Sequence, residues 1–128
     1  MNFFKKKTEN IEIKNIVRKD TAEIDLDMER VESVERRLKM DDVDALVVNG
    51  SLGVLENILV RNSDAFKSGS KKELLEKIEN AIEIASEDLK SEKVLSKVSD
   101  ATSIKTANDE LKKVKDIIFE IKNNMVKK

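Results

Sequence analysis

The chain has 128 residues, a formal net charge of −1, 40% charged residues and 3% aromatic residues, a size and composition that suit one helical domain with an aliphatic core. Histidine and cysteine are both absent, which excludes disulfides and removes the commonest general base, the usual zinc ligands and the thiolate nucleophile. We therefore expect a protein that is not an enzyme and that binds no metal and no other cofactor.

Residues 1–19 are expected to form a basic N-terminal arm, because they carry six basic residues and only two acidic ones. Ile11, Ile13 and Val17 recur at even spacings along this arm, a pattern that predicts a partly extended chain. Alternation continues further along the sequence, so a short hairpin within residues 8–28 stays open as an alternative to a helix there.

The first residues combine two apolar side chains, Phe3-Phe4, with three cations, Lys5-Lys6-Lys7. Each basic residue close to an anionic membrane contributes about 1 kcal/mol to attachment, so peripheral membrane binding through this start is one alternative function. The sequence shows no signal peptide and no apolar run long enough to span a bilayer, and it has no cysteine. These features predict a cytoplasmic protein.

A helix is expected over residues 22–40, and residues 20–128 as a whole are expected to form a single helical domain. Asp20 and Glu23 make a D-x-x-E pattern that is typical of a helix start. The apolar positions that follow have helical spacing, and they are Met28, Val31, Val34 and Leu38.

The next helix is expected to begin at the acidic cluster Asp41-Asp42-Val43-Asp44, since carboxylates accept hydrogen bonds from the free N–H groups of a helix start. Helical spacing then continues across both Gly50 and Gly53. The apolar residues with this spacing are Ala45, Val48, Leu52, Leu55 and Leu59. Two interpretations remain open: one helix weakened at Gly50, or two helices with Gly50 ending the first and Ser51 capping the second.

The same glycine stretch provides a second alternative function, that of a small-ligand, nucleotide or phosphate-binding protein. Backbone N–H groups of a glycine-rich turn that opens a helix can hold an anion, here through Gly50, Ser51 and Gly53. The stretch matches neither the P-loop nor the dinucleotide-binding pattern, and no lysine stands close to it. Close packing of helices at small residues, or a helix break, is therefore the favoured interpretation.

Residues 62–69 are expected to form a loop, and Ser70-Lys71-Lys72-Glu73 forms a capping box for the helix that follows. The apolar stripe of that helix consists of Leu74, Ile78, Ala81 and Ala85. Six serine and threonine residues then interrupt the pattern in residues 86–105, where Val94 and Leu95 either continue the helix or form a separate short one.

The last helix is expected to start at Thr106-Ala107-Asn108-Asp109, a T-x-x-D pattern. Its apolar residues have the a/d spacing of a heptad repeat, and they are Ala107, Leu111, Val114, Ile118, Ile121 and Met125. Such a seam either closes on the core of its own chain or pairs with a second chain as a coiled coil. In the second case the interface consists of Leu111, Val114, Ile118, Ile121 and Met125.

Together these elements predict an all-α fold, a helical bundle of about four to five helices, with Phe66 and Phe119 as the largest core residues. The lack of a catalytic motif and the apolar helix faces predict a protein–protein interaction module. We expect an adaptor, assembly component or regulator that self-associates, as a homo-oligomer, or docks on a larger protein. No segment concentrates basic and aromatic residues, so no contact with nucleic acid is expected.

Overall fold

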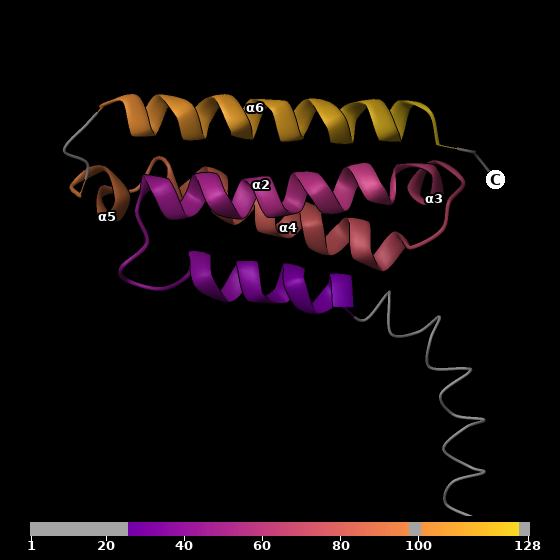
Figure 1. The fold of residues 1–128 in the computed structure, drawn as a ribbon, viewed down its shortest axis with the longest axis horizontal. Coiled ribbons are helices and arrows are strands. Elements are labelled where there is room, and N and C mark those ends of the chain that lie inside the picture. Colours follow the sequence, from indigo (N-terminus) through magenta and orange to yellow (C-terminus); the bar gives the residue numbers. More distant parts are fainter. Residues whose placement is uncertain (1–25, 98–100, 126–128) are drawn as a thin grey trace, which may run out of the picture.

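The computed structural model describes residues 26–97 and 101–125, and within these ranges it contains helices and turns but no strand (Figure 1). The expected all-α fold is therefore confirmed for the described residues. The arm of residues 1–19, with its Phe3-Phe4-Lys5-Lys6-Lys7 start, lies outside these ranges and stays a prediction. Of the hairpin alternative, residues 26–28 are described, and they are helical.

The helices are the first helix, described over residues 26–38, followed by α2 (Ala45–Arg61), α3 (Ser63–Lys67), α4 (Lys72–Asp88), α5 (Glu92–Leu95) and α6 (Ala101–Asn123). In Figure 1, α2 and α4 lie at the centre, α6 covers one side of them and the first helix covers the other. α2 and α6 run in the same direction, whereas the first helix and α4 run in the opposite one. α2 packs mainly against α6 and also contacts α4, so it is the central helix, and its outer face lies between α6 and the first helix.

The two short helices stand where the sequence pattern was least regular. The expected loop over residues 62–69 contains α3, so that part of the prediction is wrong. In the serine- and threonine-rich region, α5 is a separate short helix and not a continuation of α4. Its cap is Ser91, whose hydroxyl accepts a hydrogen bond from the N–H of Lys93 at 3.1 Å.

The core of the described residues is aliphatic apart from Phe66, which α3 places fully in the interior. The expectation that Phe119 also belongs to the core is wrong, because 67% of its surface is exposed. Ile118 and Ile121 face the core, and successive helical residues are about 100° apart around the axis. Phe119 therefore points outward beside them.

The start of α2 agrees with the sequence, whereas the start of α4 does not. Asp44 caps α2, since its carboxylate accepts a hydrogen bond from a first-turn N–H at 2.9 Å. The expected capping box at Ser70 is wrong, because Lys71 precedes α4 and makes no side-chain capping bond. Gly69, at a φ of 90°, reverses the chain after α3, and the N–H of Ser70 donates to the carbonyl of Ala65 at 2.9 Å. Ser70 thus ends α3 instead of starting α4.

α6 begins at Ala101, so its expected start at Thr106 is also wrong. The helix passes through Thr106 without interruption, and Lys105 pairs with Asp109 on its surface at 3.0 Å. Ion pairs between residues four positions apart are common on the surface of a continuous helix. The T-x-x-D pattern therefore does not mark a terminus here.

Candidate interaction surface on α2

The apolar seam predicted on the last helix faces the core of its own chain. Leu111, Val114, Ile118 and Ile121 are buried, and Met125 is partly buried against the same core. Of the two interpretations of the seam, the structure thus supports the one in which it closes within the chain. In the folded monomer these five residues therefore do not form a free apolar surface.

The predicted glycine turn does not form. Gly50, Ser51 and Gly53 all lie inside the continuous helix α2, and Ser51 is buried. Their N–H groups are in the middle of a helix, where backbone hydrogen bonding leaves no turn of free donors for an anion. The interpretation of the glycines as an intramolecular packing site is also wrong, since a Cβ atom added at Gly50 or Gly53 would meet nothing within 4 Å.

The glycines instead belong to an uncharged row on the outer face of α2, in which Gly53 is half-buried and Gly50 is exposed. This row, here named the α2 stripe, consists of Leu46, Gly50, Gly53, Val54, Asn57 and Val60. Leu46 is 68%, Val54 39% and Val60 58% exposed. The chain as a whole is 40% charged, yet four successive turns of this helix present no charge to solvent along the stripe. Exposed apolar residues that share one helix face are a recognised feature of interaction sites.

Ion pairs border the α2 stripe on both sides. Toward α6, the ammonium of Lys113 lies 3.2 Å from the carboxylate of Glu56 on α2. Toward the first helix, Arg61 pairs with Asp27 at 3.1 Å. A largely neutral, apolar centre with a polar rim is the usual layout of a protein–protein contact.

Two carboxyl groups share a hydrogen bond at the α6 border of the stripe. The hydrogen bond to Glu56, burial and the charge of Glu56 raise the pKa of Glu110 on α6. The same hydrogen bond lowers the pKa of Glu56, with help from Lys113 and against the effect of burial. Of the two carboxyl groups, Glu110 is the one whose pKa is raised. Because its pKa is raised on folding, its contribution to stability is present at low pH and is lost as the pH rises through that raised pKa.

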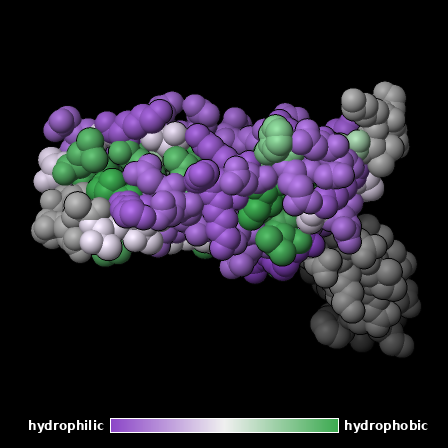
Figure 2. Space-filling model, turned by 90° about the horizontal axis from the view of Figure 1, so that it is seen from above, coloured by the Kyte–Doolittle hydropathy of each residue, from purple (hydrophilic) through white to green (hydrophobic). Residues whose placement is uncertain are grey.

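Exposed apolar residues outside α2 are more isolated. Phe119 on α6 lies on a helix face that also carries Lys112, Lys115 and Lys122. Figure 2, seen from the α6 side, shows a mostly hydrophilic surface with two separate apolar areas. One lies toward the end that holds α5 and the starts of α2 and α6, and the other lies in the opposite half of the molecule. Leu46 and Leu95 are exposed apolar residues of the helices at the α5 end. The α2 stripe is therefore the candidate with the longest uncharged row.

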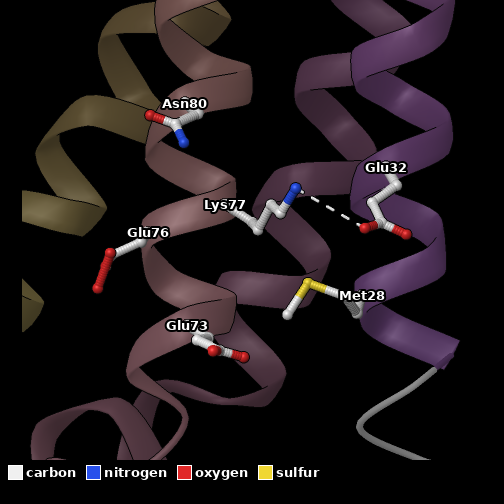
Figure 3. Close-up of a pocket in the computed structure, with 6 residues that line it drawn as sticks. All are labelled: Met28, Glu32, Glu73, Glu76, Lys77 and Asn80. Atoms are coloured by element: carbon white, nitrogen blue, oxygen red, sulfur yellow. Dashed lines mark ion pairs between the residues drawn. The ribbon is translucent and has the colours of Figure 1, made fainter.

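A hollow of about 350 Å³ between the first helix and α4 is a weaker candidate (Figure 3). Its lining residues are Met28, Glu32, Glu73, Glu76, Lys77 and Asn80. The ammonium of Lys77 reaches across to Glu32 at 3.7 Å and lies 3.9 Å from Glu35. The hollow thus already holds its own cation. In the described part of the chain, no group of three or more acidic, histidine or cysteine side chains is placed to bind a metal ion, and no helix is long and apolar enough to cross a membrane.

Replacing Gly50 or Gly53 with alanine is expected to raise the free energy of unfolding of the monomer by about 0.5–1 kcal/mol per site. The added methyl group meets open space, and alanine loses less backbone entropy than glycine when a helix forms. Urea denaturation at a protein concentration low enough to exclude association measures this change. A loss of stability in either variant would show that the glycines are required inside the monomer.

Comparisons of the chain with protein-family models, with curated proteins and with solved structures found no match. The α2 stripe is therefore identified from its own geometry and composition alone. The sequence did contain a sign of it, since no charged residue occurs from Ala45 to Leu55. Between the buried residues of this uncharged segment lie Leu46, Gly50, Gly53 and Val54, which are members of the stripe.

Proposed function

We propose that the protein is a non-enzymatic interaction module that self-associates through the α2 stripe, with a second copy of the same chain as the occupant. The observation that carries this proposal is the uncharged, mostly exposed row on a helix of an otherwise highly charged protein. The two glycines support it further, because they would allow the backbone of a neighbouring helix to approach closely. Their outward position gives them no packing role within the monomer.

The order of residues along the stripe suits an antiparallel contact with itself. In a two-fold symmetric interface, each residue contacts the partner residue at an equal distance from the centre. With Gly53 at the centre, Leu46 meets Val60 of the second copy, and Gly50 lies opposite the turn that holds Glu56 and Asn57. The apolar residues at the two ends of the stripe would then contact each other, and Gly53 at its centre would contact Gly53 of the second copy. No like charges within the stripe would oppose one another.

Replacing Leu46 with glutamate is expected to convert the oligomer to a monomer without unfolding it. Leu46 is 68% exposed, so the charge costs the monomer little, whereas in a symmetric interface it is buried twice. Solution mass by light scattering on a sizing column, at low and high salt, measures the change. Because the contact is apolar, the wild-type oligomer should persist at high salt.

The matched control is Phe119→Glu, which places the same charge at an equally exposed apolar position on α6. This variant should keep the wild-type mass. A wild-type chain that stays monomeric at every concentration would contradict the proposal, as would an equal loss of mass in both variants.

A further inference from the structure

A polar cluster lies at the end of the molecule where the first helix begins and α2 ends (Figure 1). It consists of Asp27, Arg30, Arg61, Asn62 and Lys71. One oxygen of Asp27 accepts hydrogen bonds from Arg30 at 3.0 Å and from Arg61 at 3.1 Å. Its other oxygen accepts from the side-chain amide of Asn62 at 3.2 Å. Residues far apart in the sequence thus converge on one carboxylate.

The centre of the cluster is buried and fixed. The side chain of Asp27 is only 7% exposed, and Asn62 is 6% exposed. The amide of Asn62 also donates to the carbonyl of Ile58 at 2.8 Å, and its oxygen accepts from the ammonium of Lys71 at 2.7 Å. Every polar atom of this amide therefore has a partner. Burial raises the pKa of Asp27, but the hydrogen bonds from Asn62, Arg61 and Arg30 outweigh it and leave the pKa lowered.

Lys71 adopts a backbone conformation that lysine rarely takes. Its φ of 54° lies in the left-handed region, which costs free energy for a residue with a side chain. Lys71 immediately precedes α4, and its ammonium reaches Asn62 nine residues earlier. The strained position thus brings a third cation into the cluster, at the amide oxygen of Asn62.

The cluster carries more positive charge than the carboxylate can balance. Arg30, Arg61 and Lys71 line a surface hollow of about 470 Å³. Among the described lining residues Asp27 is the one acidic residue, so these residues have a net charge of +2. Each guanidinium donates to Asp27 through a single nitrogen, although it has five N–H donors in all. Both guanidiniums are about half exposed and line the hollow, as Lys71 does, so their other donors and the charge of Lys71 can reach a ligand there.

We propose that this hollow binds a phosphate group, either as free phosphate or as the monoester group of a small molecule. A phosphate close to neutral pH carries nearly two negative charges, which matches the net charge of the lining. Guanidinium groups bind phosphate oxygens in pairs of parallel hydrogen bonds. One oxygen of Asp27 accepts a hydrogen bond from each of the two guanidinium groups and so keeps them close together. This site is separate from the proposed self-association and does not depend on it.

The test is a titration of the ¹⁵N-labelled full chain with sodium phosphate, followed by NMR at about pH 7.5, where phosphate is mostly doubly charged. Chloride keeps the ionic strength constant. We expect saturable shifts concentrated at the side-chain amide of Asn62 and the side-chain N–H groups of Arg30 and Arg61. Arg61→Gln and Arg30→Gln should each weaken phosphate binding by about tenfold or more. Both arginines are about half exposed, so both variants are expected to fold, and their backbone spectra will report this.

The matched control is Arg36→Gln, on the first helix. Arg36 is exposed and donates to Ser33 at 3.1 Å, so its removal should leave phosphate binding unchanged. A parallel titration with glycerol phosphate distinguishes the two sources: tighter binding than inorganic phosphate supports a monoester ligand, and weaker binding supports the free anion. Shifts that do not saturate, or an equal loss of binding in Arg36→Gln, would overturn the proposal.

Discussion

Replacing Phe66 with alanine is expected to lower the free energy of unfolding by about 3–5 kcal/mol, the usual cost of deleting a fully buried aromatic side chain. Phe66 is the one aromatic residue in the core of the described residues, and it comes from the short helix α3. A five-residue helix has little stability of its own. Removing its anchor should therefore also loosen the junction between α2 and α4. Urea denaturation followed by circular dichroism measures the loss.

Phe119→Ala is the matched control, since the residue type and the change are the same but the side chain is 67% exposed. Its effect on the free energy of unfolding should stay within about 0.5 kcal/mol. Similar losses in the two variants would contradict the position of α6, because they would require Phe119 to be buried.

Replacing Asp27 with alanine is expected to cost about 1–3 kcal/mol at neutral pH, the range for removing a buried, hydrogen-bonded acceptor. The buried amide of Asn62 would lose one of its acceptors, whereas Arg30 and Arg61 are about half exposed and could turn to water. The loss should therefore be smaller than that for a fully buried ion pair. Urea denaturation at neutral and at acidic pH measures it.

The effect of Asp27 on stability should depend on pH with a definite sign. Its pKa is lowered on folding, so its contribution is present above the unfolded-state pKa of about 3.9 and is lost as the pH falls through the folded-state value. The difference between wild type and Asp27→Ala should thus shrink in strong acid. Asp42→Ala is the control, because Asp42 is 70% exposed in its pair with Arg37, and its effect should be small at every pH. A difference for Asp27→Ala that grows in acid would contradict the assigned hydrogen bonds.

The long helices were predictable from the sequence because their buried residues recur at helical spacing. On α6 the heptad spacing alone identified Leu111, Val114, Ile118 and Ile121, all of which are buried. The prediction that Phe119 belongs to the core was wrong because it used the hydrophobicity of the residue and not its position on the helix. Phe119 lies one position past Ile118 and points away from the core. Local capping patterns misled at Ser70, whose N–H is already used to end α3.

The candidate sites were harder to predict, for two different physical reasons. The α2 stripe consists of neighbours on one helix, but the sequence does not tell whether another helix of the chain covers Gly50 and Gly53. The cluster around Asp27 joins residues that are distant in the sequence. Asn62 lies 35 residues after Asp27, and Lys71 lies 9 residues after Asn62. No local pattern connects such residues, and only the packing of the first helix against the end of α2 brings them together.

The most direct measurement of the proposed self-association is disulfide cross-linking of a single introduced cysteine. The chain has no cysteine of its own, and a disulfide requires Cα atoms about 4.4–6.8 Å apart. Gly53→Cys places a thiol at the centre of the antiparallel contact, where a Cβ atom meets open space in the monomer. Under mild oxidation we expect this variant to form a covalent dimer rapidly and Phe119→Cys to remain monomeric. Equal rates of cross-linking in the two variants, or none in Gly53→Cys, would contradict pairing through α2.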